Sequence, residues 1–204
     1  MEAIFIYWSQ FLHFMNSGGA IMWVLFFLNL LLWYGLGYRY FTLKRGTKGN
    51  IRRLIEKHEE QGESKVYVGL LDYAVHDAIL AAHTATTIAS KPREFIHDAL
   101  FPYLIITSNY SVLVRTIVML APLIGLLGTV IGMIETFDAL QSSSMFSQGD
   151  SIAGGISKAL FTTELGLVVA VPGLILGKIL DKKEEQFAYE FEQIVDIIST
   201  KDEK

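Results

Sequence analysis

Apolar residues in this chain are concentrated in three long runs rather than spread evenly between charged positions. Residues 3–38, 116–134 and 165–177 contain no Asp, Glu, Lys or Arg. About 17 to 25 apolar residues are needed for a helix to cross a bilayer. The pattern predicts an all-α integral membrane protein with three transmembrane helices.

We expect the three spans to cover residues 20–38, 116–140 and 156–180. The Ser-Gly-Gly sequence at 17–19 separates the first span from a leading segment, 1–19, whose aromatic residues suit a short helix at the membrane surface. No Lys or Arg precedes the apolar run and no Ala-x-Ala-like site closely follows it, so we expect no cleaved signal peptide.

Lys and Arg are distributed unevenly among the segments outside the spans. Residues 39–115 carry many of them, the short loop 141–155 carries none, and residues 181–204 carry further lysines. Basic residues near spans stay on the cytoplasmic side of a membrane. The expected topology places segments 1–19 and 141–155 outside, with a cytoplasmic helical domain at 39–115 and a cytoplasmic C-terminal helix at 181–204.

The segment between the first two spans has the spacing of amphipathic helices, with apolar positions three and four apart. Its recurring positions are Ile51, Leu54 and Ile55, and then Val66, Leu70, Tyr73 and Asp77. Gly46, Gly49, Gly62 and residues 90–92 mark the breaks. A helix beginning near Arg93 is expected to run straight into the second span. The third span is likewise expected to continue past the membrane, so that long helical extensions reach into the cytoplasm.

Small residues form one stripe on each of the second and third spans, at spacings of three, four and seven. The stripe members include Gly125, Gly128 and Gly132 in the second span, and Ala159, Gly166, Ala170 and Gly173 in the third. Small side chains let helix backbones approach closely in lipid. The stripes fit either helix packing alone or the wall of a pore shared by several subunits, with hydroxyls supplied by Thr129, Thr162 and Thr163.

Two charged residues interrupt the third span. A charge at the centre of a membrane helix costs about 2.5 to 3.5 kcal/mol. Lys158 lies near the outer end and can extend its ammonium to water, whereas Glu164 lies nearly two turns deeper and off the small stripe. We expect Glu164 to be protonated, to pair with a basic group, or to face a water-filled subunit junction. Glu135 and Asp138, at the outer end of the second span, are expected to be solvated.

The composition of the chain excludes several functional classes. The chain is 51% hydrophobic and 19% charged, has a net charge of -4 and contains no cysteine. It therefore has no strongly basic surface for nucleic acid, no disulfide and no cysteine-based metal site. It also has no H-E-x-x-H pair and no phosphate-binding Gly-Lys-Ser/Thr ending. We expect no catalytic residues, no metal and no cofactor, and hence no enzyme.

Two stretches resemble the signature of the MotA/TolQ/ExbB proton-channel family, nearest to its ExbB branch. They read APLIGLLGTVIGM at 121–133 and GISKALFTTELGLVVAVPG at 155–173. The resemblance implies a homopentamer in the bacterial inner membrane, with periplasmic N-terminus and cytoplasmic C-terminus. Its pore would hold the helices of an ExbD-type dimer. Proton flow would turn the ring relative to that dimer and pass work through a TonB-type protein to outer-membrane receptors.

Carried over by position, the family's two pore threonines fall on Thr129 and Thr163, and an acidic position common in the family falls on Lys158. Glu164 stands where relatives often have a small residue. We hypothesise that Lys158 and Glu164 form a compensating charge pair between subunits. The resemblance implies that the principal proton carrier is an Asp of the partner.

Three other functions fit the sequence less fully. A TolQ-like subunit for envelope maintenance is the nearest within the family. A non-conducting membrane scaffold would explain the helices and the small stripes without ion flow. A solute transporter is disfavoured because three spans provide no inverted repeat.

Overall fold

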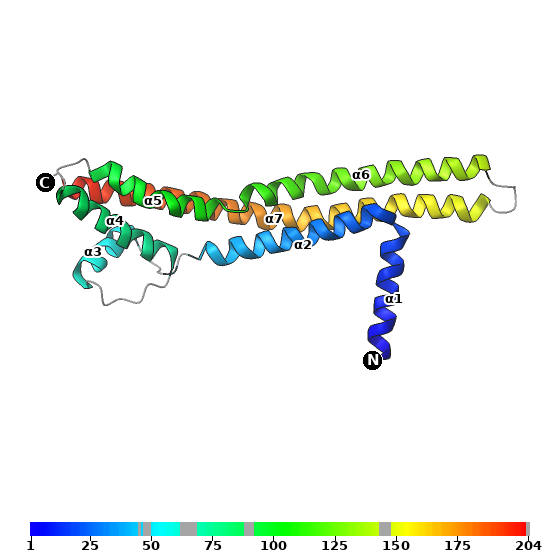
Figure 1. Ribbon diagram of the computed structural model, residues 1–204, viewed down its shortest axis with the longest axis horizontal. Coiled ribbons are helices and arrows are strands. Elements are labelled where there is room, and N and C mark those ends of the chain that lie inside the picture. Colours follow the sequence, from blue (N-terminus) through cyan, green and yellow to red (C-terminus); the bar gives the residue numbers. More distant parts are fainter. Residues whose placement is uncertain (45, 47–49, 62–68, 88–91, 143–147, 203–204) are drawn as a thin grey trace. The chain divides into compact units, whose positions relative to one another are not determined.

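The computed structural model describes residues 1–44, 46, 50–61, 69–87, 92–142 and 148–202, and these residues form helices and connections with no strand among them. The helices are α1 (Glu2–Ser17), α2 (Gly19–Thr42), α3 (Ile51–Gln61), α4 (Leu70–Thr87), α5 (Pro92–Ser108), α6 (Ser111–Ser142) and α7 (Gln148–Asp202) (Figure 1). The all-α prediction is confirmed. Gly49, Gly62, Val66, Ser90 and Lys91, named above from the sequence, lie outside the described residues.

Three helical stretches, the second of which comprises α5 and α6, are long and apolar enough to cross a membrane. They are Gly19–Thr42, Pro92–Gln141 and Ile152–Thr200, with mean hydropathies of 1.9, 2.4 and 2.0 in their most apolar windows. Each contains one of the three expected spans, so the prediction of three transmembrane helices is confirmed.

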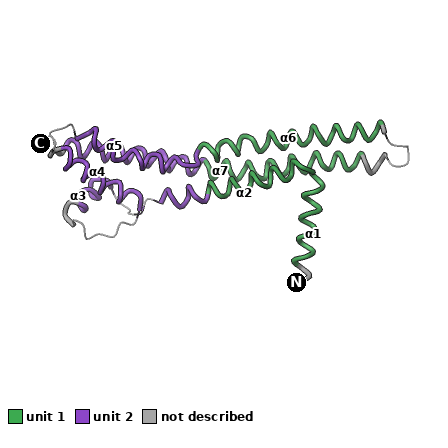
Figure 2. The backbone as a smooth tube through the Cα atoms, viewed as in Figure 1, with its two compact units in different colours: residues 1–36, 112–177 green, residues 37–111, 178–204 purple. Residues whose placement is uncertain are grey.

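The chain divides into two compact units, which Figure 2 distinguishes by colour. Unit 1 comprises Met1–Leu36 and Val112–Gly177, and therefore holds α1 with most of the three apolar helices. Unit 2 comprises Gly37–Ser111 and Lys178–Lys204, and holds α3, α4 and α5 with the ends of α2 and α7.

In unit 1, two glycines end the first helix and redirect the chain. Gly19 has a φ of +67°, a conformation that L side chains rarely adopt, and α1 leaves the other helices at this point (Figure 1). The outward residues of α1 are large and exposed, among them Phe5 at 74% and Trp8 at 59%. The expected helix is thus present, and its position at a membrane surface stays a prediction.

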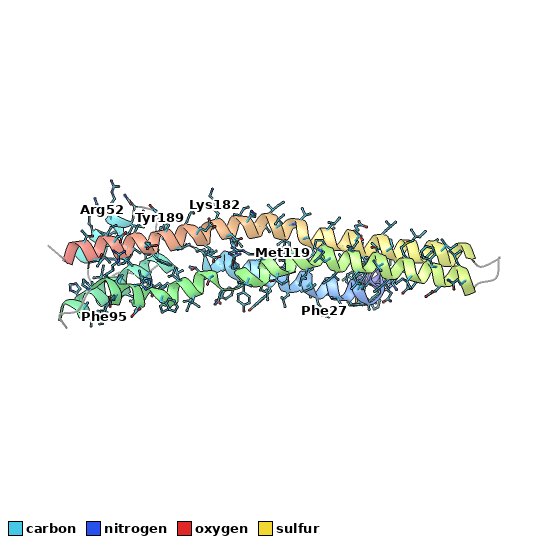
Figure 3. The ribbon with its side chains drawn as sticks, turned by 90° about the horizontal axis from the view of Figure 1, so that it is seen from above. Phe27, Arg52, Phe95, Met119, Lys182 and Tyr189 are labelled. Carbon is cyan, nitrogen blue, oxygen red and sulfur yellow. The ribbon has the colours of Figure 1, made fainter. Side chains whose placement is uncertain are left out.

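The core of unit 1 lies between α2, α6 and α7. Its buried apolar side chains include Met22, Leu25, Leu32 and Leu36 from α2, Val114, Ile117, Val118 and Ala121 from α6, and Ala159, Val169 and Ala170 from α7. The opposite faces of these helices are also apolar but exposed, as at Phe27, which lies on the outside of the helices (Figure 3). Helices that are apolar on every side require lipid or other protein around them.

Unit 2 buries one face of each of its short helices. Ile51, Leu54 and Ile55 of α3 are buried, as their spacing predicts. The predicted face of α4 is wrong, because Tyr73 is 48% exposed and the buried residues are Leu71, Ala74, Val75, Ala78, Ala82 and Ala85. A three-four spacing can be drawn through either set, and the alanines permit the closer approach.

The expected continuous helix from Arg93 into the second span is also wrong. Helix α5 ends at Ser108, and Tyr110 has a φ of +61°, which breaks the helical path before α6 begins at Ser111. A bulky residue in this conformation is uncommon. The Tyr110 ring packs against the ring of Tyr38, with centroids 4.9 Å apart, and this contact helps to hold the turn.

Helix α7 is continuous through the third span and beyond it, as predicted. It has 55 residues and contains Pro172 without interruption. Within unit 2 its apolar stripe, predicted from Phe187, Phe191, Ile194 and Ile198, is buried.

Helices α4 and α5 are joined by a short polar contact in unit 2. The Tyr103 hydroxyl donates a hydrogen bond of 2.5 Å to Asp77. Burial, and next the bond to the Asp77 carboxylate, raise the pKa of Tyr103 far above its usual value, because both favour the neutral phenol. The phenol therefore stays protonated and keeps donating to Asp77 well into the alkaline range.

Candidate functional site

The small stripes of α6 and α7 face each other within one chain. A Cβ atom at Gly132 would lie 2.7 Å from the carbonyl oxygen of Gly155 and 2.9 Å from the nitrogen of Ala159. At Gly166 it would lie 2.8 Å from the carbonyl oxygen of Ala121. Backbone atoms at such distances leave no room for a side chain, so glycine is required where the two helices touch.

The three threonines of the predicted site have different surroundings. Thr162 is fully buried and packs against Gly128, where any Cβ would overlap the threonine side chain. Its hydroxyl donates to the carbonyl oxygen of Ala159 at 2.9 Å. Thr162 therefore packs α7 against α6 within this chain.

Thr129 and Thr163 keep part of their surface accessible. The Thr129 hydroxyl donates to the carbonyl of Leu126 on its own helix at 2.7 Å. The Thr163 hydroxyl has two long bonds available, 3.3 Å to the Ala159 carbonyl and 3.4 Å across to the Gly125 carbonyl of α6. Long bonds are weak, so the Thr163 hydroxyl can exchange a backbone partner for water at low cost.

Lys158 pairs within its own chain, with a residue that we expected to be solvated. Its Nζ lies 2.5 Å from Oε1 of Glu135 on α6, and the Glu135 side chain is 49% exposed. The same lysine covers the α1–α2 junction, since a Cβ at Gly19 would lie 2.8 Å from Lys158 Cε. Glu135 is thus half exposed to solvent and, in addition, pairs with Lys158, which the sequence did not predict. These three residues lie at one level of unit 1.

Glu164 has no hydrogen bond or ion pair among the described residues, and it is exposed. Its exposed surroundings on α7 are apolar, with Val168 at 60% and Val171 at 53%. No single-chain contact therefore compensates this carboxyl group.

The three apolar helices define intervals of the same length. From Gly19 to Arg39, from Arg115 to Glu135 and from Lys158 to Lys178 the chain advances twenty residues each time. At 1.5 Å per residue this is about 30 Å, the thickness of a bilayer's hydrocarbon core. Inside these intervals the only Asp, Glu, Lys, Arg or His is Glu164, about 9 Å from the level of Lys158.

A buried charge cluster in unit 2 was not predicted from the sequence. Arg39 is 1% exposed, and its Nη2 lies 2.9 Å from Asp181 and 2.6 Å from Glu184, both on α7. Its Nε and Nη1 atoms are also buried, without a hydrogen bond to any described residue. From the sequence, Arg39 was one of several basic flanking residues. One sequence signal could have singled out Arg39. It directly follows the charge-free run 3–38, and the two acids that it binds follow the charge-free run 165–177.

In the described part of the chain no group of three or more His, Cys, Asp or Glu residues is arranged to hold a metal ion. What unit 1 presents instead is a close helix pair, two accessible hydroxyls and one uncompensated carboxyl group between charged ends. The fold and these features define an all-α membrane protein with three spanning helices.

The chain belongs to the MotA/TolQ/ExbB proton channel family. That family's sequence profile matches residues 74–193, which is more than half of the chain. The resemblance drawn from two short stretches is therefore confirmed, and the match includes both α6 and most of α7.

Relatives carry names from the ExbB branch. A biopolymer transport protein of Helicobacter pylori called ExbB-like 1 is 29% identical over 199 residues, covering 95% of this chain and 98% of its own length. A Synechocystis biopolymer transport protein called ExbB-like 3 is 34% identical over 94 residues, covering 44% of this chain. Biopolymer transport protein ExbB of Aquifex aeolicus is 35% identical over 82 residues, covering 40% of this chain and 55% of its own length. The match spans only 45% of the length of the Synechocystis relative.

Proposed function

We propose that this protein is the ExbB-type subunit of a proton-driven motor in the bacterial inner membrane. With an ExbD-type single-span partner it would use the proton motive force to energise TonB-dependent transport across the outer membrane. The observation that carries the proposal is the position of Glu164, a lone titratable group within an otherwise charge-free interval, next to Thr163 in the sequence. Ionisable residues within membrane segments face protein or water and mark ion pathways.

Assembly into a ring, expected to be a homopentamer, would give Glu164 the surroundings that one chain lacks. The exposed apolar faces of α6 and α7 are available for neighbouring subunits and for the partner's helices. In such a ring Glu164 would face a subunit junction or the central pore rather than lipid. Lys158 already has Glu135, so an exchange of charge between Lys158 and Glu164 across subunits would require that bond to open.

The accessible hydroxyls fit a path for protons. Thr129 and Thr163 can bind water or a partner carboxylate transiently once their backbone bonds are released. A proton that crosses the membrane potential yields about 2.3 kcal/mol per 100 mV. That energy is comparable to a few such hydrogen bonds, and it can shift helices between similar packings without breaking a large apolar interface.

A non-conducting scaffold is the second candidate, favoured by one observation. The small stripes are used in the contact between α6 and α7 of the same chain, so they need no pore to explain them. In a scaffold Glu164 would serve only in subunit contact.

Proton flux through the reconstituted complex of this chain with its single-span partner separates the two functions. We expect Glu164→Gln to lower the flux by about a hundredfold, the lower range for loss of a proton-transfer group. Thr129→Val and Thr163→Val should assemble normally yet lose energised transport. Thr116→Val is the matched control, because the Thr116 hydroxyl bonds its own helix at the charged end of α6. Absence of proton flux through the wild-type complex would leave the scaffold, whereas full flux in all three site variants would remove these residues from the proton path.

A further inference from the structure

The cytoplasmic end of α2 carries a compact basic and aromatic surface in unit 2. It consists of Tyr40 and Phe41 from the end of α2, Lys44 two residues beyond that helix, and Lys183 from α7, and we call it the Tyr40 patch. Lys44 Nζ lies 4.6 Å from the ring centroid of Phe41 and 5.9 Å from that of Tyr40. Lys183 Nζ lies 5.6 Å from the Tyr40 ring centroid. Two ammonium groups thus converge on one ring.

These two positive charges are not neutralised within the described chain. Lys44 and Lys183 form no ion pair with a described residue. Three acids lie within two residues of Lys183 on α7: Asp181 and Glu184 bind the buried Arg39, and Glu185 is exposed. Because Arg39 engages Asp181 and Glu184, these two carboxylates are not available to pair with the lysines.

The Tyr40 patch lies directly after the charge-free interval that ends at Arg39. Tyr40 is 55% exposed and Phe41 is 67% exposed. The Tyr40 hydroxyl has no hydrogen bond to a described residue. Exposed aromatic rings at the end of a spanning helix lie among lipid head groups, and lysines there extend toward the phosphates. The position of the patch at the end of the span, its two lysines and the free Tyr40 hydroxyl all suit an anionic lipid head group.

We propose that the Tyr40 patch binds the phosphate of an anionic phospholipid of the phosphatidylglycerol type in the cytoplasmic leaflet. Lys44 and Lys183 hold the phosphate from two sides, the Tyr40 hydroxyl donates to it, and Phe41 contacts the acyl chains. The site would hold a specific lipid against the junction of α2 and α7, independently of proton flow.

Native mass spectrometry of the full-length, detergent-solubilised protein tests the proposal with phosphatidylglycerol and phosphatidylcholine as probes. The wild-type protein should retain phosphatidylglycerol in preference to phosphatidylcholine. Lys44→Gln combined with Lys183→Gln should weaken phosphatidylglycerol binding by about fivefold per lysine, since each basic residue near an anionic lipid surface contributes about 1 kcal/mol.

Lys178→Gln combined with Lys182→Gln is the matched control, because it removes the same amount of charge from positions on α7 that lie outside the Tyr40 patch, and Lys182 projects away from α7 (Figure 3). The control should change lipid binding less than twofold, in keeping with a contact specific to the Tyr40 patch. If both double variants lose phosphatidylglycerol binding to the same extent, the binding depends on general surface charge, and the proposed site is overturned. Displacement of the lipid by inorganic phosphate alone would assign the site to a free anion. A changed subunit number in the Lys44→Gln, Lys183→Gln protein would assign the patch to contact between chains.

Discussion

At the scale of single residues, glycine is a steric requirement of the α6–α7 contact. The atoms that a Cβ would meet at Gly132 and Gly166 are backbone atoms, which cannot rotate away as a flexible side chain can. Gly37 differs, because a Cβ there would meet nothing within 4 Å. The same residue type therefore has opposite consequences at different positions of one chain.

We predict that Gly132→Ala and Gly166→Ala each lower stability by about 1 to 3 kcal/mol, the range for overpacking a close contact. The thermal unfolding midpoint in detergent measures this. Gly37→Ala is the control, and it should leave the midpoint unchanged or raise it, because alanine is favoured over glycine in a helix interior. Equal effects at all three positions would show that α6 and α7 do not approach closely.

The sequence was most informative about residues whose chemistry conflicts with their surroundings. Glu164 could be singled out from its depth alone, and the structure leaves it without a partner in the described chain. The partner of Lys158 could not be found in this way. It depends on the axial register of α6 against α7, which is set by glycine contacts distributed over both helices.

At the scale of helices, periodicity predicted their existence better than their ends and faces. The α5–α6 break at Tyr110 carries no glycine or proline, and Ser108 and Asn109 before it are only a weak turn signal. It is held by tertiary packing on Tyr38. In α4 the choice between two faces was decided by alanines, whose small size matters only once a neighbouring helix is present.

Arg39 links the end of α2 to the interior of α7, and its loss should lower stability more than the loss of an exposed arginine. We predict that Arg39→Met lowers stability by about 3 to 5 kcal/mol, because it leaves Asp181 and Glu184 without their buried partner. Adding Asp181→Leu and Glu184→Leu should recover part of the loss.

Arg93→Met is the control for the Arg39 variant. Arg93 lies 3.0 Å from Asp196, but both side chains are more than half exposed, so its loss should cost less than about 1 kcal/mol. Chemical denaturation of the detergent-solubilised variants gives both values. Similar losses for the two arginines would mean that burial adds nothing to the Arg39 cluster.

At the scale of the whole molecule, the number of spans could be predicted from the distribution of charged residues. A long apolar run with few or no charges is stable as a helix across a bilayer. The division into two units did not follow, since the boundaries cut through α2 and α7, whose helical pattern continues without a break. The predicted membrane orientation, with the loop outside and both extensions inside, is open to a direct measurement.

The absence of cysteine from the chain makes that measurement free of background. In intact cells, we predict that a membrane-impermeant maleimide labels Gln141→Cys but not Glu185→Cys, because the predicted topology places the first outside the membrane and the second inside. Opening the cells should expose Glu185→Cys. Leu126→Cys should resist labelling in both cases, although Leu126 is 59% exposed in the single chain, because lipid or another subunit covers it. The reverse labelling order would invert the topology.

The equal length of the three intervals, Gly19–Arg39, Arg115–Glu135 and Lys158–Lys178, ties the protein to one bilayer thickness. Each Å of mismatch between helix and bilayer costs a fraction of a kcal/mol, and it is relieved by tilt or by local deformation of the lipid. Because α2, α6 and α7 share the same interval, none of them can relieve mismatch for the others, and all must respond together. The acyl-chain length of the surrounding lipid therefore sets how far Glu164 lies from water.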